Sequence, residues 1–299
     1  MANSNLTPTD VTKEALVLLH NNITFVRQVN RQYDGSHERD GQKNGGEIKI
    51  RLPNEYEVQT GAALSVSDNN ETSVTLAIAT QKHVDTNFTS SELTLDIDTF
   101  SRRILAPGMA KLASAVDHDC MSMVFDVNNS AGTPGTTPAT PDALLECGEY
   151  MNDFAVPEIL RCACVNPAAN RKLVNGSNNL FNTSGRGDAQ FRSGMIADNQ
   201  LGFDEISMTQ SIRNHTTGAF AGTVLVDDAS IAEGDTTIGM DAFTDAAPDV
   251  RKGDVFTIAG VYAVNPETKE STGKLMQFTV TAQTTGSSNE ITAVPFYPA

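Results

Sequence analysis

Basic residues are scarce in this sequence. Its 299 residues include 21 Lys and Arg against 37 Asp and Glu, which gives a formal net charge of -16. Proteins that bind nucleic acid draw most of their affinity from basic side chains that neutralise phosphates and release counterions. The acidic excess therefore argues against a protein whose main activity is to hold nucleic acid.

Long hydrophobic runs are missing as well. Nothing in the sequence approaches the roughly 20 apolar residues that span a bilayer. The apolar stretch at residues 15–19 is too short for the core of a signal peptide, and the residues before it are acidic rather than basic. We therefore expect a soluble protein of the cytoplasm.

Cysteine is rare, and the four cysteines lack the spacing of a small disulfide-rich domain. Reduced, partly buried thiols are expected at these positions: Cys120, Cys147, Cys162 and Cys164. Cys162 and Cys164 share one side of an expected strand, but no second pair accompanies them as a zinc site would require.

Motifs for catalysis and cofactor binding are also missing. Asp117, His118, Asp119 and Cys120 form the densest cluster of ligand-type side chains. Neighbours on a helix point in different directions, however, and zinc needs about four convergent ligands. His215 with Asp204 has no catalytic motif around it, and no glycine-rich phosphate loop occurs. We expect no catalytic residue, metal or cofactor, and an enzyme is the least favoured function.

The N-terminal region predicts a helix followed by a β-ribbon. A capping threonine and a proline precede apolar residues that recur at helical spacing up to Leu19. Two alternating stretches then predict strands that pair as a hairpin, with these residues on the apolar face: Ile48, Ile50, Leu52, Leu76 and Ile78. An isolated two-stranded ribbon is only marginally stable in water. The apolar face must dock on the rest of the chain or on another copy, which indicates an assembly protein.

The middle of the chain has a mixed α+β pattern. Apolar spacing predicts a helix of roughly 28 Å over residues 107–125, because each residue adds about 1.5 Å. A loop rich in Gly, Pro and Thr follows over residues 128–141. A helix at 142–152, a buried strand at 159–165 and a short helix at 166–176 complete this part.

The last eighty residues predict a small β-barrel or sandwich. Short apolar runs alternate there with Gly, Asp, Asn and Pro turns, and an exposed hairpin turn is expected at 265–274. The five expected strands cover residues 223–226, 236–240, 255–264, 275–282 and 291–294.

Two short motifs leave other interpretations open. An Arg-Gly-Asp tripeptide at residues 186–188 matches an adhesion motif, and several Asn-x-Ser/Thr triplets match glycan acceptors, although chance and turn formation explain both better. Asp10 and Glu14 give the first helix an acidic face that could dock a basic partner, while a solvated helix face is the commoner reason for such charges.

The order of these elements resembles the major capsid protein of tailed phages, with the Hong Kong 97-like fold, and most closely the coat-protein family of phage P22. The residues that carry the resemblance are 47–53 with 74–84 (E-loop), 98–123 (spine helix), 165–167 with 202–206 (A-domain), and 250–261 with 277–280 (inserted β-barrel). The implied domains are an N-terminal arm (1–46), an E-loop hairpin (47–95), a peripheral domain with the spine helix (96–130), an A-domain (131–217) and a β-barrel insertion domain (218–299).

The resemblance implies a protein that assembles with other copies of itself into hexamers and pentamers of an icosahedral shell. The shell would enclose DNA without binding it specifically. Assembly in the host cytoplasm would involve a scaffolding protein, contacted by Asp10 and Glu14, and a portal. The family chain returns to its A-domain after the barrel, so we expect the polypeptide to continue past Ala299. The rival interpretation is a phage tail or receptor-binding module that uses the β-domain and residues 186–188.

Overall fold

The computed structural model describes residues 8–29, 47–54, 56, 58, 60–62, 66, 71–77, 80–85, 87, 97–176, 193–196, 199–228, 231–232 and 234–298. Ile78, the side chain of Ile48 and the tripeptide at 186–188 lie outside these residues.

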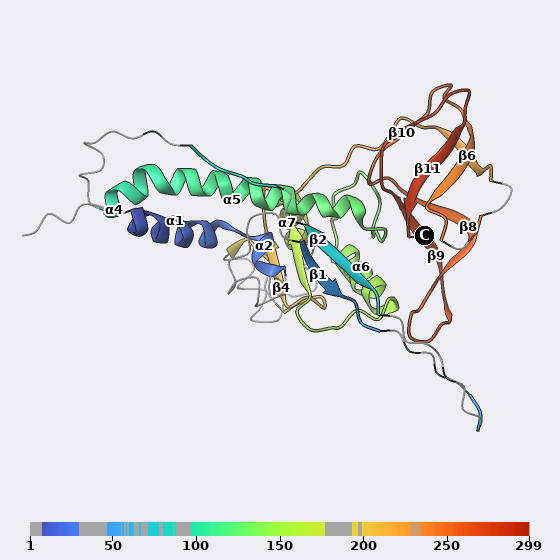
Figure 1. Ribbon diagram of the computed structural model, residues 1–299, viewed down its shortest axis with the longest axis horizontal. Coiled ribbons are helices and arrows are strands. Elements are labelled where there is room, and N and C mark those ends of the chain that lie inside the picture. Colours follow the sequence, from blue (N-terminus) through green and yellow to red (C-terminus); the bar gives the residue numbers. More distant parts are fainter. Residues whose placement is uncertain are drawn as a thin grey trace, which may run out of the picture.

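A helical rod supports the N-terminal part of the molecule (Figure 1). The rod runs without a break through α4 (Ile97–Phe100), the π-helical turn η1 (Ser101–Leu105), α5 (Ala106–Cys120) and the 3₁₀ helix η2 (Met121–Asp126). α1 (Pro8–Asn22) lies along α5. Both expected helices are confirmed, and Pro107 lies in the first turn of α5 as predicted.

The face that α1 turns toward α5 is the apolar one. Val11, Ala15, Leu18 and Leu19 are half-buried, as their helical spacing predicts. The short helix α2 (Phe25–Gln28) continues the chain onto the other end of α5.

The predicted hairpin is present. β1 (Glu47–Arg51) pairs antiparallel with β2 (Ser73–Ala77), and the register places Ile48 opposite Leu76 and Ile50 opposite Val74. All five residues of β2 are exposed to solvent. Among the described residues, little therefore covers the apolar face of this ribbon.

The central part combines helices with a parallel strand pair. α6 (Asp142–Asp153) and α7 (Pro167–Gly176) accompany β3 (Cys162–Val165), which pairs in parallel with β4 (Glu205–Met208). Its core consists of Val165, Ala169, Leu173, Ile196, Phe203 and Ile206. The strand expected at 159–165 begins only at Cys162, because Ile159 and Leu160 belong to an exposed loop.

The C-terminal part is a curled antiparallel sheet of five strands in the order β5-β6-β11-β9-β8. The strands are β5 (Gly222–Val226), β6 (Thr237–Phe243), β8 (Val255–Val264), β9 (Ser271–Val280) and β11 (Ile291–Tyr297), and β7 (Asp249–Val250) pairs separately with β10 (Thr284–Thr285). The edge strands β5 and β8 line the same apolar cavity of about 270 Å³, so the sheet curls around its core.

All five predicted strands are therefore present: β8 has the predicted bounds, and the other four have shifted ends. β9 begins at Ser271, so the exposed turn after β8 is shorter than the expected 265–274. The core of this sheet consists of Ile238, Met240, Phe243, Val250, Val280, Ile291, Val294 and Phe296.

Candidate functional site

A buried carboxylate attaches the N-terminal segment to the rod. Asp117 on α5 is 2% exposed. Its Oδ2 accepts a hydrogen bond from the Thr24 backbone N–H at 2.8 Å, and its Oδ1 accepts one from the Val26 N–H at 3.2 Å. Two backbone donors at the start of α2 are thereby satisfied by one charged acceptor, an arrangement stronger than a neutral hydrogen bond.

The other members of the Asp-His-Asp-Cys cluster point elsewhere. His118 Nδ1 lies 3.0 Å from the Ser211 carbonyl oxygen. Asp119 pairs with Lys82 at 2.8 Å and with Arg213 at 3.5 Å. The hydrogen bond from Lys82 lowers the pKa of Asp119 below its ordinary value, and the positive charge of Arg213 acts in the same direction. Asp117 and Asp119 therefore fasten different segments to α5 and do not converge on one point.

α2 also contacts the parallel strand pair. Arg27 Nη2 lies 2.7 Å from Glu205 Oε1, and Gln28 Nε2 donates to Ser207 Oγ at 3.1 Å. The Cys164 thiol donates to Gln28 Oε1, also at 3.1 Å. Burial raises the pKa of the Cys164 thiol.

All four cysteines are half-buried free thiols. Burial raises the pKa of each of them above its ordinary value. Their partial burial agrees with the partly buried thiols expected from the sequence.

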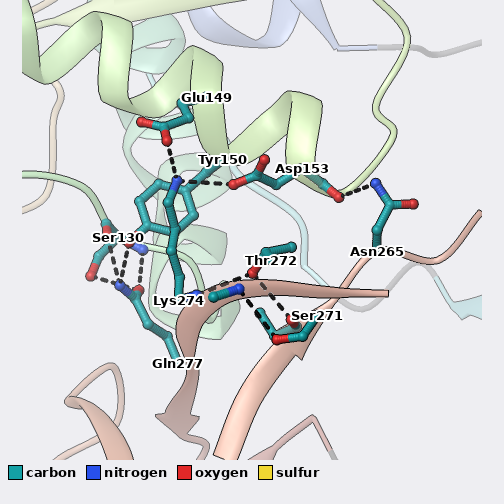
Figure 2. A network of polar contacts seen from close by, with 11 residues as sticks. Ser130, Glu149, Tyr150, Asp153, Asn265, Ser271, Thr272, Lys274 and Gln277 are labelled. Atoms are coloured by element: carbon teal, nitrogen blue, oxygen red, sulfur yellow. Dashed lines mark hydrogen bonds and ion pairs between the residues drawn. The ribbon is translucent and has the colours of Figure 1, made fainter. Parts of the chain in front are cut away.

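Lys274 joins the β-strand region to α6 (Figure 2). Its Nζ lies 2.7 Å from Glu149 Oε1 and 2.9 Å from Asp153 Oδ2. The same ammonium lies 4.5 Å from the centroid of the Tyr150 ring, within reach of a cation–π interaction. Asn265 Nδ2 donates to the Asp153 carbonyl oxygen at 2.8 Å, so the β8–β9 hairpin is held on α6 at two points.

Gln277 fastens the same strand to the segment that follows the rod. Its Oε1 accepts the Ser130 N–H at 2.6 Å, and its Nε2 donates to the Ser130 carbonyl oxygen at 3.0 Å (Figure 2). The amide side chain thus pairs with a backbone amide in both directions, as a strand neighbour would.

The end of the rod packs directly on the sheet. Phe125 of η2 lies against Gly253, where an added Cβ would approach the ring atoms to 3.0 Å. His215 Nε2 lies 2.7 Å from Asp254 Oδ1, and Lys252 pairs with Asp126 at 2.7 Å. Rod, α6 and sheet are therefore connected by specific contacts.

The contact residues predicted from the sequence lie in two places, on the ribbon and on α1. Ile50 is half-buried, while Leu52 and Leu76 are 44% and 46% exposed on the ribbon. Asp10 is exposed in the first turn of α1. Glu14 instead faces η1, because its Oε1 accepts a hydrogen bond from Ser101 Oγ at 2.9 Å.

Sequence reasoning missed the roles of Lys274, Gln277 and Asp117. Asp117 had a detectable signal, since it stands four residues after the buried Ala113 and four before the buried Met121. An acidic residue in the middle of an apolar helix stripe requires a buried partner. Lys274 and Gln277 have no comparable signal, because polar residues are ordinary on an exposed strand face.

The described part of the chain offers neither a metal-binding cluster nor a membrane-spanning helix. No group of three or more His, Cys, Asp or Glu residues there could hold a metal ion. None of its helices has the length and hydropathy to cross a bilayer. A polar groove of about 820 Å³ lies between α6 and the loop at 199–204, and it has no metal-ligating cluster.

Comparison with known proteins identifies the family. A family model described as P22 coat protein (gene protein 5) matches residues 1–297. No curated protein matches. A solved chain from Mycobacterium phage Che8 has a TM-score of 0.46 at 20% identity, covering 92% of this chain and 85% of that chain. Because the family match spans nearly the whole sequence, the chain belongs to the P22 coat protein family and is a major capsid protein of a tailed phage.

Proposed function

We propose that this coat protein uses the parts of a Hong Kong 97-like subunit. The arm would be residues 1–46, the E-loop 47–95, the peripheral domain 96–130, the A-domain 131–217 and the inserted β-barrel 218–299. The continuous rod, the ribbon and the curled sheet support this division. The contacts of Lys274 with α6 support a fixed attachment of the barrel to the A-domain.

In this proposal, the ribbon lies over a neighbouring copy in the shell. Leu52, Val74 and Leu76 are 44%, 53% and 46% exposed, although a two-stranded ribbon needs support to be stable. Burial of these side chains by a neighbour would supply that support at about 25 cal/mol per Å² of apolar surface. Each contact can be weak, because each subunit makes many of them.

The partners of assembly are part of the same proposal. The shell encloses DNA without specific binding, and the net charge of -16 suits a wall that does not grip phosphates. A scaffolding protein and a portal would take part in the host cytoplasm.

We assign the scaffold contact to the exposed Asp10 together with Glu14, whose hydrogen bond to Ser101 fixes its position. Asp10→Lys should weaken scaffold-dependent assembly, and unchanged assembly would refute the assignment.

Amide hydrogen exchange tests the role of the ribbon. Residues 47–51 and 73–77 should exchange rapidly in dissociated subunits and at least about tenfold more slowly in assembled shells, because burial suppresses local opening. Residues 169–173 in the core of the central part should be protected in both states and serve as the internal control. Equal exchange of the ribbon in the two states would contradict the proposal.

A further inference from the structure

The loop between α6 and β3 presents aliphatic side chains to solvent. Ile159 is 79% exposed, Leu160 is 81% exposed, and Val156 in the same loop is 44% exposed. Single exposed aliphatic residues are common on protein surfaces, but a cluster of three in five residues is a patch of the kind that marks an interaction site.

The loop is held in place from within. Arg161, which is 8% exposed, donates from Nε to the Pro157 carbonyl oxygen at 3.0 Å and from Nη2 to the Val156 carbonyl oxygen at 2.5 Å. The Leu160 N–H donates to Asp204 Oδ2 at 2.7 Å, and the Asp204 N–H donates to the Arg161 carbonyl oxygen at 2.8 Å. A buried guanidinium and a carboxylate thus fix the loop at both ends.

Two residues of the loop have a left-handed backbone. The φ angles are 54° at Ala155 and 62° at Leu160. Residues other than Gly, Asn and Asp generally avoid this region, and a bulky residue there is an outlier held in a turn by its surroundings. Leu160 therefore occupies a position where a smaller or polar residue would suit both the backbone and the solvent.

We propose that Ile159 and Leu160 form an apolar contact between this subunit and a second copy of the chain. The proposal rests on the established coat function, since a shell surrounds each subunit with copies of itself. Copies that carry a net charge of -16 repel one another, and apolar burial is a contact energy that offsets this repulsion. A loop that is already fixed loses little conformational entropy on binding, which suits it to this task.

The surroundings of the loop add a complementary surface. Glu158 and Arg161 from the loop line the groove of about 820 Å³, and Leu145 and Leu201 add apolar side chains to its wall. The exposed pair Ile159 and Leu160 lies beside this groove, so a second copy could cover the pair and insert a side chain into the groove. Burial of the pair by a second copy would contribute about 25 cal/mol per Å² of apolar surface removed from water.

The test uses the full chain with Leu160→Asn. Asparagine tolerates the left-handed backbone, so the melting temperature should not fall, while the apolar contact is lost. We expect self-association, measured by sedimentation velocity over a concentration series, to weaken at least about tenfold, since burial of one leucine is worth more than that factor. Leu225→Asn removes a leucine that is 59% exposed on β5 and should leave association unchanged.

Several results would overturn the proposal. If Leu160→Asn associates as tightly as the wild type and forms normal shells in electron microscopy, the contact is refuted and the coat function is not. A wild-type chain that stays monomeric in every condition would refute both.

In a second measurement, Leu160→Cys should react with maleimide at least about tenfold more slowly in shells than in dissociated subunits, because buried groups are protected. Protection that appears only when a scaffolding protein is added would show a different partner.

Discussion

Lys274 connects two parts of the subunit through one ammonium group. Burial alone would lower the pKa of this group, but hydrogen bonds with Glu149 and Asp153 raise it above its ordinary value. A raised pKa means that the stabilisation is fully present below the pKa of the unfolded chain, about 10.4, and is lost as the pH rises through the higher folded value. The lysine therefore keeps its charge at neutral pH, and the contact weakens as the pH rises into strong alkali.

Lys274→Met should loosen the junction between the β8–β9 hairpin and α6. We expect faster amide exchange over residues 265–277 and a loss of about 0.5–1 kcal/mol in the free energy of unfolding, because the pair is partly solvated. Lys252→Met removes the more exposed pair with Asp126 and is the control, with a smaller effect expected. Unchanged exchange over 265–277 in Lys274→Met would show that packing alone holds the hairpin.

Asp117 marks the limit of sequence reasoning at the residue scale. Its place on the apolar stripe of the rod helix follows from helical spacing. Its partners, the backbone amides of Thr24 and Val26, are about ninety residues away, and no local pattern identifies them. The sequence could therefore predict that this acid is unusual, but not what it binds.

At the scale of elements, periodicity predicted most of the fold. α1, α5, α6, the ribbon and the five strands of the C-terminal sheet lie where apolar spacing placed them, and α7 lies where helix start and end residues placed it. Element ends were less accurate, because tertiary contacts decide them: the strand expected from residue 159 begins at Cys162, where pairing with β4 begins. α2 is four residues long and depends on Asp117, so its own sequence carries too little signal.

Gly253→Ala should disturb the packing of η2 on the sheet. Gly253 has a φ of 92°, and a Cβ there would meet the Phe125 ring at 3.0 Å. We expect a loss of about 2–3 kcal/mol in the free energy of unfolding, from left-handed strain together with crowding. Gly273→Ala is the matched control, since its φ is 77° and no atom lies within 4 Å of the added Cβ. Equal losses in thermal or urea unfolding would mean that the contact with Phe125 contributes nothing.

At the scale of the whole molecule, acidic charge and exposed apolar surface act in opposite directions on assembly. The charge of -16 keeps copies apart, while the ribbon and the loop at 155–161 present apolar area that the described residues of the chain leave exposed. A subunit of this kind should stay dispersed when dilute and associate when repulsion is reduced or when many weak contacts form together. The balance between the two forces depends on ionic strength.

Salt should therefore promote assembly. The Debye length falls from about 10 Å at 0.1 M to about 3 Å at 1 M, which removes most of the repulsion between copies and leaves apolar burial intact. We expect the lowest concentration that gives particles, measured by light scattering, to fall about tenfold over this range. Sucrose at matched osmolality should not reproduce a shift of that size, because it does not screen charge. At every salt concentration, Leu160→Asn should need a higher protein concentration to give particles than the wild type. The dependence on salt should keep the same slope, since the substitution removes an apolar contact. A rise in the required concentration with salt would mean that ion pairs between copies, and not apolar contacts, hold the shell together.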